Sequence, residues 1–413
     1  MKTNYFLILF IAPCILLASC KKTNTAQDKP VQFTKSQVAV LNSSNQFGFN
    51  LFKDMVSASA DNDNLFISPL SISFALTMTY NGAANQTATD MQTALCYGDL
   101  SKETINESCK ELMQILLNLD PKVAMEIANS IWYRNTFPVR TDFLNLNKTY
   151  FDAEVEPADF NDPHTVDLIN GWVNTKTHEK IPNVITEIPS DMVMYLINAI
   201  YFKGAWTYRF ETKNTEKATF YLTDGTPYQT DFMNMKERFR YMKNDLLSAV
   251  EMPYGKGDFS MMVLLPNEGK TYNDVISNLN SENWTSWTSK LDSTNVFVNL
   301  PKFKFSYKKT LNQDLVNLGM GIAFDPSNAD FTGINEAGQL YISFVLHKSF
   351  VEVNEEGTEA AAVTVVGVSL TSVGPAEPVY VNFNVNKPFI FAIKENSTNS
   401  ILFMGLVKKP VIE

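Results

Sequence analysis

Side chains that could carry out catalysis are few in this sequence. Its 413 residues include only three histidines, His164, His178 and His347, and the patterns HExxH, CxxC and GxSxG are absent. A hydrolase needs a nucleophile, a base within hydrogen-bonding reach and donors that stabilise an oxyanion. Gly-rich phosphate-binding loops are absent too, so we predict that the protein is not an enzyme. Because serines and acidic residues are abundant, the sequence leaves open one kind of enzyme: one with a catalytic triad that no local motif marks.

The three histidines have ordinary structural interpretations. His164 lies in NDPHT, which is typical of a turn, and His178 fits the polar face of a helix. His347 lies in an otherwise apolar, strand-like stretch, where a single histidine is more often a hydrogen-bonded core residue than a ligand. We therefore predict no metal site and no cofactor.

One long segment has the composition of a strand. In NEEGTEAAAVTVVGVSLTSVGPAE, residues 354–377, no charge occurs from Ala360 to Ala376, and β-branched residues are frequent. An exposed segment of this kind tends to recruit other chains into sheets. A soluble protein with such a segment is either prone to aggregation or uses the segment as an additional strand of its own sheet.

The overall composition is that of a globular protein with a large core, with 45% hydrophobic and 19% charged residues. The net charge is −10, and the basic residues are scattered rather than gathered in a run. This pattern disfavours nucleic acid as a partner and gives no sign of a heparin-type stripe.

The N-terminus resembles that of a bacterial lipoprotein. The apolar run at residues 5–17 is shorter than the ~20 residues of a membrane span but fits a signal peptide. The letters LASC, which end at Cys20, resemble a lipobox. We therefore predict a signal peptide at 1–19, lipidation of Cys20 and a polar tether at 20–40. These features predict an exported lipoprotein held at the outer membrane, on a face that the sequence leaves open. The alternative is an ordinary signal peptide whose cleavage site precedes a cysteine.

Two cysteines, Cys96 and Cys109, belong to the folded part. They are too few for a disulfide framework, and Cys109 continues an apolar helical stripe with Ile105 and Leu112. We therefore predict free thiols, with disulfide pairing as the alternative for an exported protein.

Helix signals come early in the chain and strand signals later. Ser68-Pro69 predicts a helix start and Asn81-Gly82 its end, and further helices are expected from Ser101, at 165–180 and at 271–280. After residue 123, stretches such as VAMEIANSIWYR and LYISFVLHKSFVEVN predict strands. This order indicates an α+β fold, and because no linker interrupts residues 41–413 we expect a single domain there.

Several motifs together resemble the serpin family, over nearly the whole chain from about residue 45. They are NLFISPLSI at 64–72, NAIYFKGAW at 198–206, the acidic hinge that begins at Glu355, NKPFI at 386–390 and FMG at 403–405. The resemblance implies three β-sheets, eight to nine helices and an exposed reactive-centre loop at about 355–379. It also implies a monomer that inhibits serine proteases, and also cysteine proteases, through a covalent complex. The target cleaves the loop, an acyl-enzyme forms, and the loop inserts as a new strand.

The hinge residues suit such an insertion. They are Glu355, Glu356, Gly357, Thr358, Glu359, Ala360, Ala361 and Ala362. Alternation along a strand would bury small or β-branched side chains and leave Glu359 facing solvent; the buried set is Thr358, Ala360, Ala362, Thr364 and Val366. Proline is absent from 355–373, so every residue there can donate a ladder hydrogen bond.

The family's spacing from the first hinge glutamate places the reactive bond at Thr371–Ser372. Because the segment 372–388 looks longer than in many relatives, cleavage after Leu370 or Val368 stays open. No Lys or Arg lies near this bond, so we expect elastase-like or subtilisin-like targets rather than trypsin-like ones. The sequence does not identify the target protease itself.

The resemblance also assigns two control regions in the central sheet. The shutter is a buried hydrogen-bond cluster beneath the point where the sheet opens, and its matching residues are Ser68, Ser71, Asn198 and His347. The breach lies at the top of the sheet and matches Trp206 and Lys302, where we expect Lys302 to pair with Glu355. Without the resemblance, Ser68 would be a helix cap, Asn198 a core amide and Lys302 a surface charge.

A non-inhibitory serpin is the alternative function, as a chaperone, carrier or storage protein. Such members tend to have bulky or charged residues or proline in the hinge. This chain has Gly-Thr-Glu-Ala-Ala-Ala at 357–362, which favours inhibition.

Overall fold

Helices dominate the chain up to residue 118, and strands dominate after it. The computed structural model describes residues 31–358 and 378–413, of which Phe33–Glu413 form one unit. The predicted helix start at Ser68-Pro69 is confirmed, because Ser68 caps α2 (Pro69–Tyr80) by accepting a hydrogen bond from the Ser71 N–H. The other α-helices are α1 (Lys35–Ser57), α3 (Asn85–Ala94), α4 (Lys102–Asn118), α5 (Thr141–Phe151), α6 (His164–Lys176), α7 (Tyr272–Ser277), α8 (Ser281–Ser289) and α9 (Asn312–Leu315).

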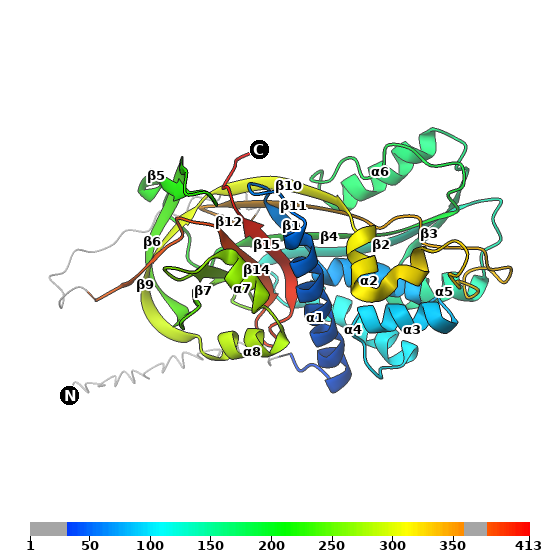
Figure 1. The fold of residues 1–413 in the computed structure, drawn as a ribbon, viewed down its shortest axis with the longest axis horizontal. Helices are drawn as coiled ribbons and strands as arrows, with labels where there is room; N and C mark the ends of the chain where they lie inside the picture. Colours follow the sequence, from blue (N-terminus) through cyan, green and yellow to red (C-terminus); the bar gives the residue numbers. More distant parts are fainter. Residues whose placement is uncertain (1–30, 359–377) are drawn as a thin grey trace, which may run out of the picture. The chain divides into compact units, whose positions relative to one another are not determined.

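Within the described residues, the smaller sheet has six strands in the order β10-β11-β12-β4-β2-β3. Its neighbours are antiparallel except for the parallel pair β2 and β3. The strands are β2 (Val123–Arg134), β3 (Glu154–Ala158), β4 (Met194–Ala205), β10 (Phe303–Thr310), β11 (Leu346–Asn354) and β12 (Gly357–Thr358). Figure 1 shows α6 on one face of this sheet and α2 and α4 on the other.

Over residues 31–358 and 378–413, the larger sheet has nine strands in the order β1-β15-β14-β8-β7-β6-β9-β13, with β5 paired to β6. Its strands are β1 (Leu65–Ile67), β5 (Glu216–Tyr221), β6 (Pro227–Lys243), β7 (Leu247–Tyr254), β8 (Phe259–Pro266), β9 (Asp292–Pro301), β13 (Val381–Asn384), β14 (Phe389–Glu395) and β15 (Ile401–Val407). The 17-residue strand β6 pairs with β5 at one end and with β7 at the other. Two of the three implied sheets are therefore joined through β6, and the α+β class is confirmed.

The core lies around α2, which contacts both β4 of the smaller sheet and β15 of the larger one. Ten of its twelve residues are buried, as expected for a helix that is apolar on all sides. Aromatic rings continue this packing between the sheets: Phe66 stacks on Phe403 with ring centroids 5.2 Å apart, and Phe202 meets Phe403 edge to face. The two sheets and α2 thus form one continuous apolar layer.

Several predicted bounds differ from the observed ones. The strand expected from residue 340 begins only at Leu346, because its partner β10 ends at Thr310, which pairs with Leu346, and the chain after Thr310 turns into α9. α6 begins at His164, which was predicted as a turn residue, and it ends before His178, whose backbone is left-handed at φ 49°.

The two cysteines of the folded part, Cys96 and Cys109, are free, as predicted, and burial raises the pKa of both thiols.

Within residues 31–358 and 378–413, no helix combines the length and apolar character needed to span a bilayer.

Candidate functional site

The central feature of the smaller sheet is a gap between β4 and β11, which we call the slot. In the part of the chain that the structure describes, only β12 lies between these two strands, where Thr358 pairs with Gly204 on one side and Val353 on the other. Further along the slot, a cavity of about 250 Å³ lies between β4 and the start of β11. Residues 194–199 of β4 and residues 339–348 line its two sides, and α2 lines its floor. Its roof is lined by Val173 of α6 and by Ile181, Val184 and Ile185, which follow α6.

The first hinge residues already occupy the upper end of the slot. Thr358 is buried, and its hydroxyl is hydrogen-bonded to the Tyr254 hydroxyl at 2.5 Å. This inward direction agrees with the alternation expected from the sequence. A Cβ on Gly357 would collide with the carbonyl oxygen of Gly204, so only glycine fits where the chain enters the sheet.

The hinge glutamates are held by ion pairs at the top of the slot. Lys302 Nζ lies 2.9 Å from Glu355 Oε2, so the expected pair is present, and the Thr215 hydroxyl donates to Glu355 Oε1 at 2.7 Å. Burial opposes the charge on Glu355, but these hydrogen bonds outweigh it, and its pKa is lowered. Arg209 pairs with Glu356 at 2.8 Å.

Trp206 connects the hinge to the sheet. Its indole N–H donates to the Asn354 carbonyl oxygen at 2.9 Å, and its backbone N–H donates to the Glu356 carbonyl oxygen at 2.9 Å. Its ring stacks on Tyr254, with centroids 4.5 Å apart. The residues assigned to the breach therefore surround the point where β11 turns into β12.

The residues assigned to the shutter lie together beneath the slot. Ser68 donates from its N–H to His347 Nε2 at 3.4 Å and from its hydroxyl to the Leu402 carbonyl oxygen at 2.7 Å. The Ser71 hydroxyl donates to Asn198 Oδ1. Asn198 belongs to β4 and His347 to β11, so the cluster contacts both sides of the slot. Burial lowers the pKa of His347 to about 4, partly offset by a backbone hydrogen bond at Phe66, so this imidazole is neutral at pH 7.

Some residues of the site were not predicted. Asn129 accepts a hydrogen bond from Asn198 Nδ2 at 2.7 Å and extends the cluster to β2, and Thr215, Arg209 and Tyr254 contact the hinge. The Asn-Ser pair inside the apolar strand VAMEIANSIWYR was a usable signal for Asn129. The other three carried no local signal, because their contacts join distant parts of the chain.

Residues 177–185, which we call the strap, follow α6 and cross the outer face of the slot. On the β2 side, His178 Nε2 lies 2.6 Å from Glu126 Oε1. On the β11 side, Lys348 Nζ donates to the Asn183 carbonyl oxygen at 3.0 Å. The Asn170 side chain ties the far end of the strap to α6 by three hydrogen bonds with Val184 and Ile185. Any strand that enters the slot would pass under this segment.

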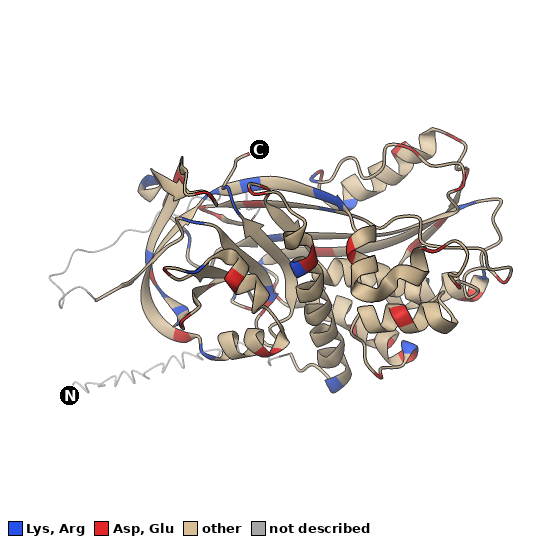
Figure 2. Ribbon diagram, viewed as in Figure 1, with Lys and Arg blue, Asp and Glu red and all other residues tan. Residues whose placement is uncertain are grey.

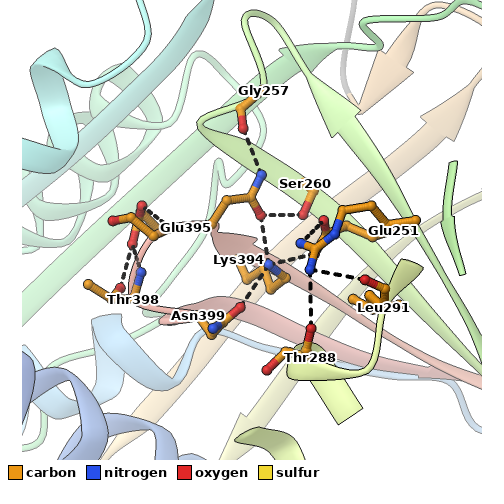
Figure 3. Close-up of polar contacts among 12 residues, drawn as sticks. Glu251, Gly257, Ser260, Thr288, Leu291, Lys394, Glu395, Thr398 and Asn399 are labelled. Carbon is orange, nitrogen blue, oxygen red and sulfur yellow. Dashed lines mark hydrogen bonds and ion pairs between the residues drawn. The ribbon is translucent and has the colours of Figure 1, made fainter. Parts of the chain in front are cut away.

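The larger sheet contains a second buried polar region, the ion-pair cluster of Glu251, Lys394 and Arg240. Lys394 is fully buried, and its ammonium lies 2.7 Å from Glu251 Oε2, while Arg240 lies 2.8 Å from Glu251 Oε1. Figure 3 shows Asn399 and other polar groups around this ammonium. Burial lowers the pKa of Lys394. Because each of these charges lies against a group of opposite charge, we regard the cluster as structural.

Several predicted residues lie outside the described part of the chain. They are Cys20, Glu359, Ala360, Ala361, Ala362, Thr371 and Ser372.

Comparison with known proteins finds members of one family that are similar to this chain over nearly its full length. A family model described as Serpin (serine protease inhibitor) matches residues 42–410. An uncharacterized serpin-like protein of Methanosarcina mazei is 32% identical over 413 residues, covering 98% of this chain and 96% of that protein. Intracellular coagulation inhibitor 1 of Tachypleus tridentatus is 35% identical over 381 residues, covering 90% and 89%. The crystal structure of native tengpin, a thermophilic serpin, superposes with a TM-score of 0.82 at 35% identity, covering 92% and 96%.

Proposed function

This chain belongs to the serpin family of protease inhibitors, and we propose that it is a suicide inhibitor that inserts its cleaved loop into the slot. The observation that carries the proposal is the seating of Gly357 and Thr358 between β4 and β11. Further along the same gap, a cavity of about 250 Å³ lies between β4 and the start of β11. The loop that continues from Thr358 is therefore attached to the entrance of the space that it would fill.

The chemical step belongs to the target protease. Its nucleophilic hydroxyl or thiol attacks the carbonyl carbon of the bond at Thr371–Ser372, the new amine of Ser372 leaves, and an acyl-enzyme remains on the loop. Insertion then moves the attached enzyme before water can hydrolyse the ester or thioester. The inhibitor needs no catalytic group of its own for these reaction steps.

The seated hinge sets the register of insertion. In antiparallel pairing, partners on both neighbours change by one residue at each step. Because Thr358 pairs with Gly204 and Val353, Thr364 would lie opposite Asn198 and His347, directly over the shutter. A threonine hydroxyl there could hydrogen-bond to that polar cluster, whereas a charged side chain would be buried without a partner.

The energy released is large enough to disable a protease. About fourteen inserted residues, each gaining roughly 0.5–1.5 kcal/mol from hydrogen bonds plus side-chain burial, release on the order of 10–30 kcal/mol. A protease domain is stable by only ~5–15 kcal/mol. Insertion could therefore distort the trapped enzyme.

The target class and location remain part of this proposal. The apolar and small residues before the reactive bond support elastase-like or subtilisin-like enzymes. The lipobox-like residues before Cys20 support a lipoprotein that acts at the outer membrane of a bacterium.

The reaction of residues 21–413 with an elastase-like and a subtilisin-like protease tests the function. We expect an adduct that survives denaturing electrophoresis and a released fragment that begins at Ser372 by mass spectrometry. Cleavage without an adduct by every protease tried would place the chain among the non-inhibitory serpins.

Thr358→Arg should convert the inhibitor into a substrate. The arginine would have to enter a buried position beside Tyr254, which opposes the first step of insertion. We expect adduct formation to fall at least about tenfold, the equivalent of ~1.4 kcal/mol, while loop cleavage continues. Glu359→Arg is the matched control, because alternation places that side chain on the outer face. Equal loss in both variants would contradict the proposed register.

A further inference from the structure

Charged residues are spread over the described chain (Figure 2), and Lys394 of the ion-pair cluster is one of the few that are fully buried. Lys394 is the last residue but one of β14, and its ammonium donates to Asn396 Oδ1 at 2.7 Å. Asn396 follows β14 in the turn that leads to β15 and is half-buried. The structure therefore holds a primary amine against a side-chain amide that it could attack.

Burial favours the neutral, nucleophilic form of the Lys394 amine. A lysine that is removed from water loses its proton more easily and can then attack a carbonyl carbon. Burial lowers the pKa of Lys394, the negative charge of Glu251 opposes this shift, and the positive charge of Arg240 adds to it. Glu251 Oε2 lies 2.7 Å from Lys394 Nζ, within reach to accept its proton.

The amide of Asn396 is held in place by two further hydrogen bonds (Figure 3). The buried Ser260 hydroxyl donates to Asn396 Oδ1 at 2.6 Å, and Asn396 Nδ2 donates to the Gly257 carbonyl oxygen at 2.7 Å. The Ser260 hydroxyl would stabilise negative charge on Oδ1 during an attack on the neighbouring carbon. Asn399 Oδ1 accepts from the same ammonium at 3.0 Å, but among the described residues it has no second donor. Asn396 is therefore the better electrophile of the two.

We propose that Lys394 and Asn396 form an intramolecular amide bond, with Glu251 as the proton acceptor and Ser260 as the donor to the oxyanion. Lys394 Nζ attacks Asn396 Cγ, the bond between Cγ and Nδ2 breaks, and Nδ2 leaves as ammonia. Of the three protons on the lysine ammonium, one stays on the new amide nitrogen. The other two leave with Nδ2 as an ammonium ion, the first of them by way of Glu251, whose carboxylate is restored.

The product suits the same surroundings. Glu251 would keep Arg240 as its partner at 2.8 Å, so the loss of charge on Lys394 leaves no unpaired carboxylate. The new amide N–H lies within reach of Asn399 Oδ1. The ion pairs of Lys394 described above belong to the chain before this bond forms. The bond would fix the end of β14 to the turn that follows it.

Peptide mass mapping of the full-length protein, after incubation at neutral pH, tests the proposal. We expect the peptide that contains Lys394 and Asn396 to be lighter by about 17 Da, the mass of one ammonia molecule. Trypsin needs a free cation in its specificity pocket, so it should no longer cleave after Lys394. Tandem mass spectrometry should locate the mass loss within residues 394–396.

Lys394→Arg is the decisive variant. Arginine keeps a positive charge beside Glu251 but stays protonated and cannot attack the amide, so the lighter peptide should disappear. Asn396→Ser removes the electrophile and keeps Lys394, and it should also abolish the mass loss. Asn399→Gly is the matched control, because it removes the other amide at the ammonium and glycine suits the backbone there, at φ 57°. This control should form the bond as wild type does.

A second reaction of Asn396 also releases ammonia, because the backbone nitrogen of Ser397 can attack Cγ and form a succinimide. That product leaves Lys394 free, so trypsin would still cleave after it, and the mass loss would persist in Lys394→Arg. Either of these results, or an unchanged mass in wild type after prolonged incubation, would overturn the proposal.

Glu251→Gln tests the role of the proton acceptor. Glutamine cannot take the proton, so the bond should form at least about tenfold more slowly than in wild type. An unchanged rate would remove Glu251 from the reaction. None of these outcomes depends on whether the chain traps a protease, so the amide bond and the inhibitory function stand or fall separately.

Discussion

The two sheets of this protein use buried polar side chains in different ways. In the larger sheet, the ion-pair cluster joins β6, β7 and β14. Each of these strands is paired with a neighbouring strand at the residue that belongs to the cluster. In the smaller sheet, the shutter and the breach lie along a slot whose two sides share, among the residues that the structure describes, only the two residues of β12. The ion-pair cluster therefore stabilises strands that are already paired with their neighbours, whereas the shutter and the breach contact the strands on the two sides of a gap in the sheet.

This difference indicates which substitutions should lower the stability of the folded protein and which should affect insertion of the loop. We expect the polar contacts of the ion-pair cluster to keep their partners when the loop enters, because its residues belong to the other sheet. Contacts of Glu355, His347 and Asn198 border the space that the loop would fill. The predictions below separate these two kinds of contact, beginning with the largest expected effect.

Breaking the ion-pair cluster should cost the most stability. Lys394→Met removes the fully buried ammonium that lies 2.7 Å from Glu251, and a buried charge that loses its partner typically costs ~3 kcal/mol or more. We expect urea denaturation to show a fall of about this size in the free energy of unfolding, with adduct formation retained at temperatures where the variant is folded. A loss below about 1 kcal/mol would show that Arg240 alone can neutralise Glu251.

Mild acid should weaken the shutter. The pKa of His347 is lowered to about 4 from an ordinary 6.5, so between these values the unfolded chain takes up a proton that the folded chain does not. Stability from this group is therefore complete above about pH 6.5 and falls as the pH drops toward 4, by ~3 kcal/mol in total. Denaturation at a series of pH values should show this slope in wild type and lose it in His347→Gln. The same slope in both proteins would assign it to other groups.

Removing the breach ion pair should have a smaller effect. Lys302→Ala leaves Glu355 with the Thr215 hydroxyl as its remaining side-chain donor, and we expect a loss of about 1 kcal/mol. Hydrogen exchange at the amides of Gly357 and Thr358 should become faster, because their anchor is weaker. Lys217→Ala removes an exposed pair with Asp231 and is the control, with an expected change below about 0.5 kcal/mol. Unchanged exchange in Lys302→Ala would mean that β12 is held by its backbone alone.

The sequence predicted the features that depend on neighbouring residues. The Ser68-Pro69 helix start is one, and the inward direction of Thr358 is another, because capping and strand alternation are local rules. The family motifs placed the four shutter residues in one cluster, which local rules could not have done.

Features that depend on distant partners could not be predicted in this way. A strand was expected from residue 340, but it begins at Leu346, because its partner β10 ends at Thr310, opposite Leu346. Lys394 and Glu251 meet only through the order of the strands in the larger sheet, and nothing near either residue indicates the other. The strap across the slot likewise depends on how α6 packs on β2 and β4.

Thermal unfolding before and after cleavage of the loop tests the central claim most directly. A protease that nicks residues 359–377 without being trapped would release the strand, and scanning calorimetry would compare the nicked with the intact chain. If the released strand fills the slot, the melting temperature should rise by at least ~10 °C, as expected for a gain on the order of 10 kcal/mol or more in a chain of this size. A nicked chain that melts at or below the temperature of the intact chain would contradict the claim that the slot is a place held for the loop.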